Sequence, residues 1–141
     1  MDVLQEVDRI PGLPKPINPK QHSILDYITI GGFFLASGLM WKRNLRGAIA
    51  AMVNGAFVLS YTLLTDFEGN GDKPVSFYTH GKLDTVQAAM AAAAPTVLGF
   101  GEKHGKASWF FHGQAMNEVL VIRMTDWEAA EGPRARLRRV A

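Results

Sequence analysis

The stretch His22-Ser-Ile-Leu-Asp26 has a counterpart, His80-Gly-Lys-Leu-Asp84, in the second half of the chain. Each begins a long, weakly polar run, and each such run is followed by a second one. The second runs end on the similar sequences Thr65-Asp66-Phe67 and Thr125-Asp126-Trp127. The interval between the His-Asp pairs is nearly equal to the interval between the Thr-Asp pairs. We therefore interpret the chain as one two-helix unit used twice, in residues 22–67 and 80–127.

Formal charge is almost absent from four runs of this 141-residue chain, whose net charge is +2. Residues 27–41, 47–65 and 85–101 contain no Asp, Glu, Lys or Arg, and residues 107–122 contain only Glu118. A helix needs about 20 mostly apolar residues to span a bilayer. We therefore predict an all-α fold, a four-helix transmembrane bundle, with spans near residues 19–41, 46–67, 79–100 and 108–127. The alternative is a soluble, alanine-rich four-helix bundle, but the runs lack the charged stripe that a water-facing helix shows.

The segments outside the two repeats are polar, basic or rich in proline. Residues 1–21 combine a short amphipathic pattern with four prolines, which predicts an interfacial arm followed by a stiff linker. Residues 68–79 are expected to form a polar loop, and residues 128–141 a basic tail suited to anionic lipid headgroups. Asp2, Glu6 and Asp8 interrupt the first ten residues, so these do not form the apolar core of a signal peptide.

The composition limits the partners that the chain can have. Cysteine is absent, which excludes disulfides, thiolate metal sites and cysteine nucleophiles. The small net charge and the lack of interleaved aromatic and basic residues argue against nucleic acid. The expected partner is the lipid bilayer. Small residues four apart, such as Ala51 and Gly55, let helices approach closely and permit a homo-oligomer, while Asn54 is expected to hydrogen-bond to another helix.

Four spans would place both termini on one side of the membrane. That side carries more lysine and arginine than the two short turns on the other side. Because an excess of positive charge stays cytoplasmic, we expect both termini inside the cell.

The third run resembles a known family. His80-Gly-Lys-Leu-Asp84, followed by Ala93-Ala-Pro95-Thr-Val-Leu-Gly99-Phe100, is similar to the repeat of small bacterial membrane proteins called SPW-repeat proteins. In that repeat a His or Asp near the helix start precedes a Ser/Ala-Pro-Trp-x-x-Gly-Phe end. Thr96 stands where the family has tryptophan, and the first repeat has Ser37-Gly38 without a proline. The resemblance implies a multi-pass protein of paired helices in the bacterial inner membrane. It brings no established activity, so no catalytic residue is carried over.

Ionisable residues are expected to gather at one membrane face. The first and third spans begin on the side where the second and fourth end, and residues four apart share a helix face. Six residues should therefore lie near one another: His22, Asp26, Asp66, His80, Asp84 and Asp126.

Several interpretations of this group remain open. The first is a structural polar clamp in a protein that is not an enzyme, because aspartates favour helix starts and histidines suit headgroups. The second is a metal, proton or ion site, since imidazole and carboxylate suit zinc, manganese or iron. The two histidines would also serve as axial ligands of haem b. Glu118, in the middle of the fourth run, is a candidate proton relay. The sequence contains no phosphate loop, nucleophile elbow or His-Glu-x-x-His zinc motif.

Overall fold

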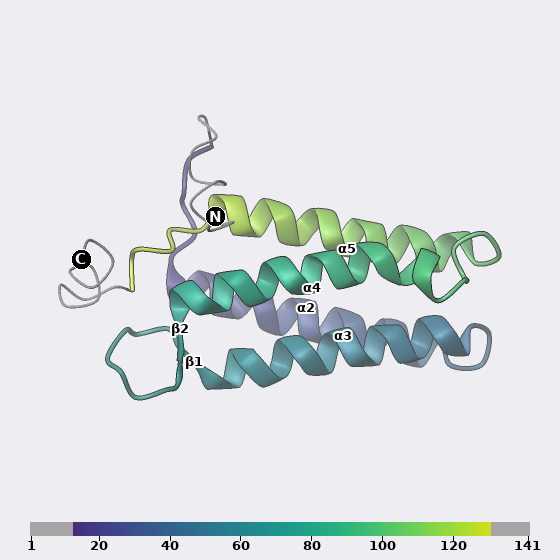
Figure 1. Ribbon diagram of the computed structural model, residues 1–141, viewed down its shortest axis with the longest axis horizontal. Coiled ribbons are helices and arrows are strands. Elements are labelled where there is room, and N and C mark those ends of the chain that lie inside the picture. Colours follow the sequence, from purple (N-terminus) through teal and green to yellow (C-terminus); the bar gives the residue numbers. More distant parts are fainter. Residues whose placement is uncertain (1–12, 131–141) are drawn as a thin grey trace.

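The computed structural model describes residues 13–130. Four long helices dominate this part of the chain (Figure 1). They are α2 (Pro19–Met40), α3 (Leu45–Leu64), α4 (Phe77–Val97) and α5 (Gly105–Met124), with two short strands, β1 (Thr65–Asp66) and β2 (Val75–Ser76), between α3 and α4. The predicted all-α fold is confirmed. The amphipathic part of the N-terminal arm and most of the basic tail lie outside the described residues.

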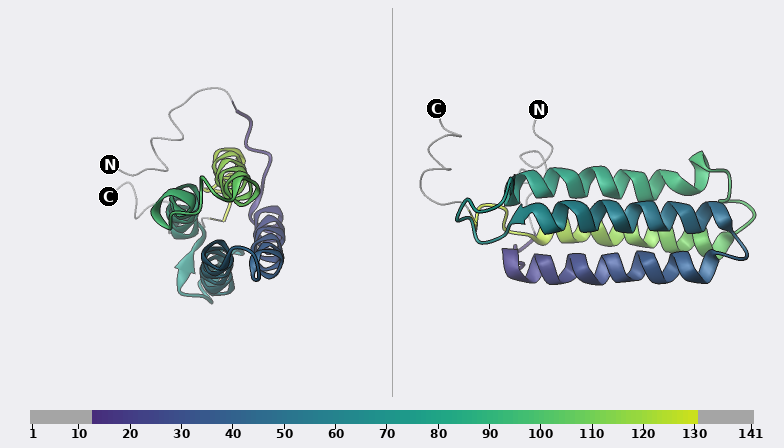
Figure 2. Two further views of the ribbon diagram at one scale, coloured as in Figure 1. Left: turned by 90° about the vertical axis from the view of Figure 1, so that its right-hand side faces the viewer. Right: turned by 90° about the horizontal axis from the view of Figure 1, so that it is seen from below.

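The four helices form an antiparallel bundle. Seen end-on, they occupy the corners of a square, with α2 and α4 on one diagonal and α3 and α5 on the other (Figure 2). The starts of α2 and α4, the ends of α3 and α5, and both strands lie at the same end of the bundle (Figure 1). We call this end, defined by β1 and β2, the strand end.

Side-chain caps determine where three helices begin. The Asn18 side chain accepts a hydrogen bond from the backbone N–H of Gln21, and the Gln21 side chain accepts one from the N–H of Asn18. This capping box, with Pro19 in the first turn, explains the start of α2. Asn44 and Ser76 cap α3 and α4 in a similar manner.

The two Thr-Asp segments lie beyond the helix ends, because α3 ends at Leu64 and α5 at Met124. The sequence analysis had placed both segments inside the predicted spans, and that part of the prediction is wrong. Thr65 and Thr125 are extended, with ψ of 132° and 134°. β1 pairs in parallel with β2, which leads into α4. Thr125 forms a bridge with Ile17, which leads into α2, and Ile17 exchanges backbone hydrogen bonds of 3.1 and 2.9 Å with the residues on either side of Thr125. Each Thr-Asp segment is therefore tied to the start of one of the histidine-bearing helices.

The bundle interior is largely apolar away from the strand end, with a buried hydrogen bond between Gln87 and Asn54 in its middle. Phe33, Phe100 and Phe111 pack among alanines of α3, α4 and α5. Phe77 and Trp127 pack together at the strand end. Beside them, the buried residues in the first turns of α2 and α4 are histidines and aspartates.

Two of the four helices, α2 and α3, are long and apolar enough to cross a membrane. By the same measure α4 and α5 do not qualify, so the prediction of four spans is supported for only two helices. The lower hydropathy of these helices comes from residues such as His80, Lys82 and Asp84 in α4 and Asn117 and Glu118 in α5.

The close packing of α3 against α2 depends on Gly55. A Cβ added there would lie 3.1 Å from Phe33 Cβ and 3.1 Å from the ring of Phe34. We expect Gly55→Leu to push the helices apart and to lower the free energy of unfolding by about 1–3 kcal/mol, as overpacking usually does. Gly31→Leu is the matched control, because nothing lies within 4 Å of its added Cβ. Thermal unfolding followed by circular dichroism compares the two, and equal midpoints would contradict this account of the packing.

Candidate functional site

Four polar side chains from α2 and α4 meet at the strand end: His22, Asp26, His80 and Asp84. Each histidine precedes its aspartate by four residues, so both members of a pair point to the same side of their helix. Their exposed fractions are 0–2%, so the group is closed off from solvent. One nitrogen or oxygen atom from each residue lies within 4.8 Å of the other three. We call these four residues the His/Asp cluster.

The Nε2 atom of each histidine faces both carboxylates. His22 Nε2 lies 3.0 Å from Asp84 Oδ2 and 3.3 Å from Asp26 Oδ1. His80 Nε2 lies 3.1 Å from Asp26 Oδ2 and 3.3 Å from Asp84 Oδ1. The shorter contact of each histidine therefore goes to the aspartate of the other helix, across the diagonal of the bundle.

The other ring nitrogen of each histidine contacts a threonine hydroxyl. Nδ1 of His22 lies 2.9 Å from Oγ1 of Thr125, and Nδ1 of His80 lies 2.8 Å from Oγ1 of Thr65. Each hydroxyl already donates its proton to the carbonyl oxygen four residues earlier, at 2.7 Å for Thr65 and 2.6 Å for Thr125. A hydroxyl has a single proton to donate, so the threonine oxygens must accept from the histidines. Nδ1 of both histidines therefore carries a proton.

The proton on Nδ1 determines what each histidine presents to the centre of the cluster. A neutral imidazole protonated on Nδ1 has its lone pair on Nε2, where it meets the carboxylate oxygens. Lone pairs and carboxylates at these distances repel, so the centre requires either protons, on Nε2 or on the carboxylates, or a cation between them. Within residues 13–130, His80 Nε2 finds no hydrogen-bond partner, although two carboxylate oxygens lie within 3.3 Å of it.

Hydroxyl groups of α3 orient the carboxylates. Tyr61 Oη donates to Asp84 Oδ1 at 2.7 Å, and Thr62 Oγ1 donates a longer hydrogen bond of 3.4 Å to Asp26 Oδ2. Both aspartates therefore have a donor besides the histidines, which limits their rotation.

Aromatic rings enclose both histidines. Phe77 and Trp127 lie against His22, with ring centroids 5.4 and 4.9 Å away. Tyr61 and Phe67 lie against His80, at 4.9 and 5.2 Å. Each Thr-Asp-aromatic segment thus supplies one histidine with both a hydroxyl acceptor and a covering ring.

Asp66 and Asp126 are at the same end of the bundle but do not join the cluster. Asp66 accepts hydrogen bonds of 2.6–3.3 Å from three backbone N–H groups of the loop that follows it. Asp126 accepts one of 3.1 Å from the N–H of Glu128. The expected group of six therefore reduces to four, because both helices end before these aspartates and leave them in turns. Sequence reasoning missed the threonines beside them, although their recurrence in both Thr-Asp pairs was a usable signal.

Glu118 is buried on α5 but is not a member of the His/Asp cluster. Its role as a proton relay stays a prediction.

The geometry of the histidines does not suit haem. Their ring centroids are 5.1 Å apart and the rings are nearly perpendicular, at 82°. Both carboxylates lie beside the Nε2 atoms, where a porphyrin held between two axial histidines would need space.

No protein-family model, curated protein or solved structure matches the chain. The resemblance to SPW-repeat proteins therefore stays a prediction.

The hydroxyl of Tyr61 provides a test of the carboxylate contacts. Tyr61→Phe removes the donor to Asp84 and leaves a buried oxygen with one hydrogen bond fewer, which should lower the free energy of unfolding by about 1–3 kcal/mol. Tyr27→Phe is the control, because Tyr27 is 51% exposed. Denaturant unfolding measures both, and equal losses would show that the hydroxyl contact contributes nothing.

Proposed function

We propose that the protein is a small multi-pass integral membrane protein without catalytic activity, in which the His/Asp cluster joins two copies of a two-helix unit at one membrane face. In this proposal all four helices cross the bilayer, and lipid surrounds them. Membership of the SPW-repeat type of membrane protein is part of the same proposal.

The outward surface of the bundle carries the membrane part of the proposal. Residues 27–40 of α2 and 47–64 of α3 contain no formally charged side chain. On α4, the exposed residues after Lys82 are only Val, Ala and Thr. On α5, no exposed residue between Lys106 and Arg123 is Asp, Glu, Lys or Arg. A belt free of exposed formal charge therefore surrounds all four helices.

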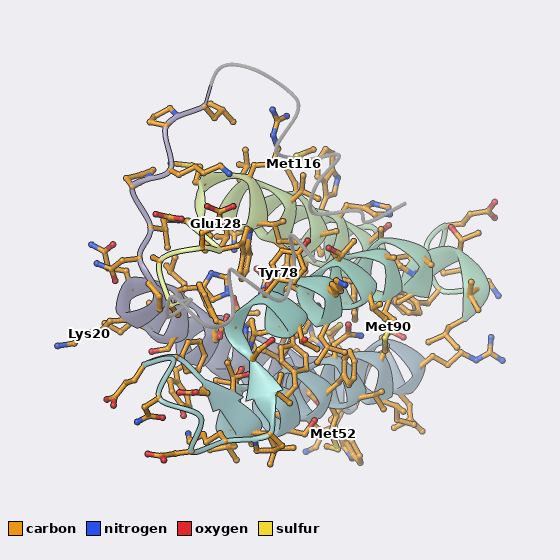
Figure 3. The ribbon with its side chains drawn as sticks, turned by 60° about the vertical axis from the view of Figure 1, so that its left-hand side comes forward. Lys20, Met52, Tyr78, Met90, Met116 and Glu128 are labelled. Carbon is orange, nitrogen blue, oxygen red and sulfur yellow. The ribbon has the colours of Figure 1, made fainter. Side chains whose placement is uncertain are left out.

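Large apolar side chains project from this belt. Leu39, Val97 and Trp109 are each more than 70% exposed. Met52 on α3 and Met116 on α5 lie on the outside of the bundle (Figure 3). An apolar surface on every side of a small bundle is costly in water and favourable in lipid.

Much of the polarity of α4 is directed inward, as is Glu118 of α5, whereas His112 and Asn117 of α5 are exposed. His80, Asp84, Gln87 and Glu118 are all at most 3% exposed. The mean hydropathy of a helix counts these buried residues in the same way as residues that would face lipid. Polar groups inside a membrane bundle, however, face its interior. Helices of 21 and 20 residues are about 30 Å long, which matches the hydrocarbon core of a bilayer.

The His/Asp cluster suits a joint between the two halves. A short turn connects α2 to α3, and another connects α4 to α5. The contacts of His22 with Asp84, and of His80 with Asp26, link one pair of helices to the other. Separating the halves would leave buried charges without partners, which is strongly unfavourable in a low dielectric. A tandem repeat would produce this pattern, in which the histidine of each two-helix unit contacts the aspartate of the other.

Cysteine labelling distinguishes four spans from two, since the chain has no cysteine of its own. Single cysteines replace Arg43 in the first turn, Gly71 in the strand-end loop and Glu102 in the last turn. If four helices span, an impermeant maleimide added to sealed vesicles labels Arg43→Cys and Glu102→Cys from one side and Gly71→Cys from the other.

If only α2 and α3 span, Glu102→Cys is labelled from the same side as Gly71→Cys. A chain that stays in the supernatant when expressed without detergent would exclude the membrane proposal altogether. Labelling of detergent-solubilised protein controls for the reactivity of each cysteine.

Removing one carboxylate tests the joint. Asp84→Ala removes the acceptor of Tyr61 and the nearer of the two carboxylates beside His22, so it should lower the free energy of unfolding by about 3–5 kcal/mol. Asp72→Ala removes an exposed loop carboxylate and should change it by less than about 0.5 kcal/mol. Unfolding in detergent compares the two variants, and similar stabilities would mean that the cluster does not join the halves.

A further inference from the structure

We propose that His22, Asp26, His80 and Asp84 together bind one divalent metal ion of the zinc class, as a closed structural site. This inference rests on the proposed joint and names what completes it: a cation at the centre of the His/Asp cluster.

The spacing of the four side chains is close to that of a tetrahedral site. Zinc binds imidazole nitrogen and carboxylate oxygen at about 2.0–2.2 Å, which places neighbouring ligand atoms of a tetrahedron roughly 3.3–3.6 Å apart. The four distances from Nε2 to carboxylate oxygen are 3.0, 3.1, 3.3 and 3.3 Å. Each carboxylate meets the two histidines with different oxygens, and one ligand atom from each residue lies within 4.8 Å of the other three. Rotation of the carboxylates is therefore needed to place one oxygen of each aspartate beside the ion.

Both histidines already present the atom that a metal requires. A metal binds the unprotonated nitrogen, and the other ring N–H of a metal-bound histidine almost always donates to an acceptor that fixes the ring. Here Thr65 and Thr125 are those acceptors, each fixed in turn by its bond to a helix carbonyl. His80 Nε2 is buried and makes no hydrogen bond to any of the described residues. In the neutral ring with its proton on Nδ1, the lone pair of Nε2 is directed to the centre.

The charge of the cluster favours a dication. Two carboxylates carry a charge of −2, which one divalent ion balances while both imidazoles stay neutral. A buried site is most stable when its charges sum to zero and its oxygens are also hydrogen-bonded. Tyr61 and Thr62 supply those hydrogen bonds to Asp84 and Asp26.

The ligand set indicates the class of ion and its role. Two imidazoles and two carboxylates, with no thiolate, suit zinc and neighbouring divalent transition metals. Four protein ligands complete a tetrahedral shell, and structural zinc sites have no open position, whereas catalytic ones keep one for water. The rings of Phe67, Phe77 and Trp127 close the surroundings of the histidines. The ion therefore stabilises the bundle and does not activate a substrate.

Metal analysis of the full chain is the direct test. The protein is purified in detergent with a tag that contains no histidine and without chelator, and its metals are measured by mass spectrometry. We expect one zinc-class ion per chain. After chelation, titration with Co²⁺ should saturate at one equivalent and produce the intense visible bands of four-coordinate cobalt.

Matched variants locate the ion. Asp26→Asn and His80→Gln keep side-chain size and should abolish stoichiometric cobalt binding. His112→Gln, which changes an exposed histidine on α5, should leave it intact. Thr65→Val and Thr125→Val should weaken metal affinity by about 10–100-fold, because they release the histidine rings, while Thr65→Ser and Thr125→Ser should retain it.

Folded wild-type protein that contains no ion and gives no four-coordinate cobalt spectrum would overturn the metal site. In that case protons on Nε2 or on the carboxylates take the place of the ion, and the proposed joint stands if Asp84→Ala still destabilises the protein. A weak, six-coordinate spectrum, or binding that Asp26→Asn and His80→Gln leave unchanged, would also overturn it. Loss of the joint alone would appear as metal binding in a protein that Asp84→Ala does not destabilise.

Discussion

The hydrogen bond from Nδ1 of each histidine to a threonine hydroxyl is the interaction on which the strand end depends. It fixes the orientation of the ring and the position of its proton, and so directs Nε2 toward two carboxylates. With the rings turned over, the carboxylates would lose their closest partners inside a closed interior. The threonine itself has no freedom to adapt, because its proton is committed to the last turn of its own helix. Backbone carbonyls therefore fix the two hydroxyls, and the hydroxyls in turn fix the orientation of the two imidazoles.

This arrangement needs the chain to leave α3 and α5 in an extended conformation. In a continuing helix the backbone groups of these residues would bond within the helix and could not pair with the segments before α4 and α2. Instead, β1 pairs with the segment before α4, and Thr125 pairs with the segment before α2. The backbone pairing holds each threonine beside the first turns of the helix that carries its histidine. The β1–β2 pair and the Ile17–Thr125 bridge therefore stabilise the position of the two threonines, although each involves very few residues.

The sequence predicted the members of the His/Asp cluster because two simple rules apply to them. Spacing of four puts His and Asp on one helix face, and alternation of direction puts both helix starts at one end. The cross-helix hydrogen bond of Asn54 was also predictable, and Gln87 makes it at 3.2 Å. Asp66 was expected in the cluster because the predicted span ran to residue 67, whereas α3 ends at Leu64. Helix ends are the least predictable feature of a helix, and this difference puts Asp66 in the turn that follows. Tyr61 gave no signal at all, since an aromatic residue near the end of an apolar run resembles an interfacial one.

The distribution of polarity in α4 and α5 shows why composition alone understates how apolar the surface is. A residue contributes to hydropathy by its type, but it contributes to solvation only by the surface it exposes. His80, Asp84 and Glu118 of these helices are buried, whereas Val97 and Trp109 face outward. The outward surface is therefore more apolar than the sequence average. Because the His/Asp cluster is buried, its charges must balance: a low dielectric strengthens every electrostatic contact and raises the cost of every unpaired charge. The short contacts at the centre therefore need either protons shared between imidazole and carboxylate or a metal ion that binds both.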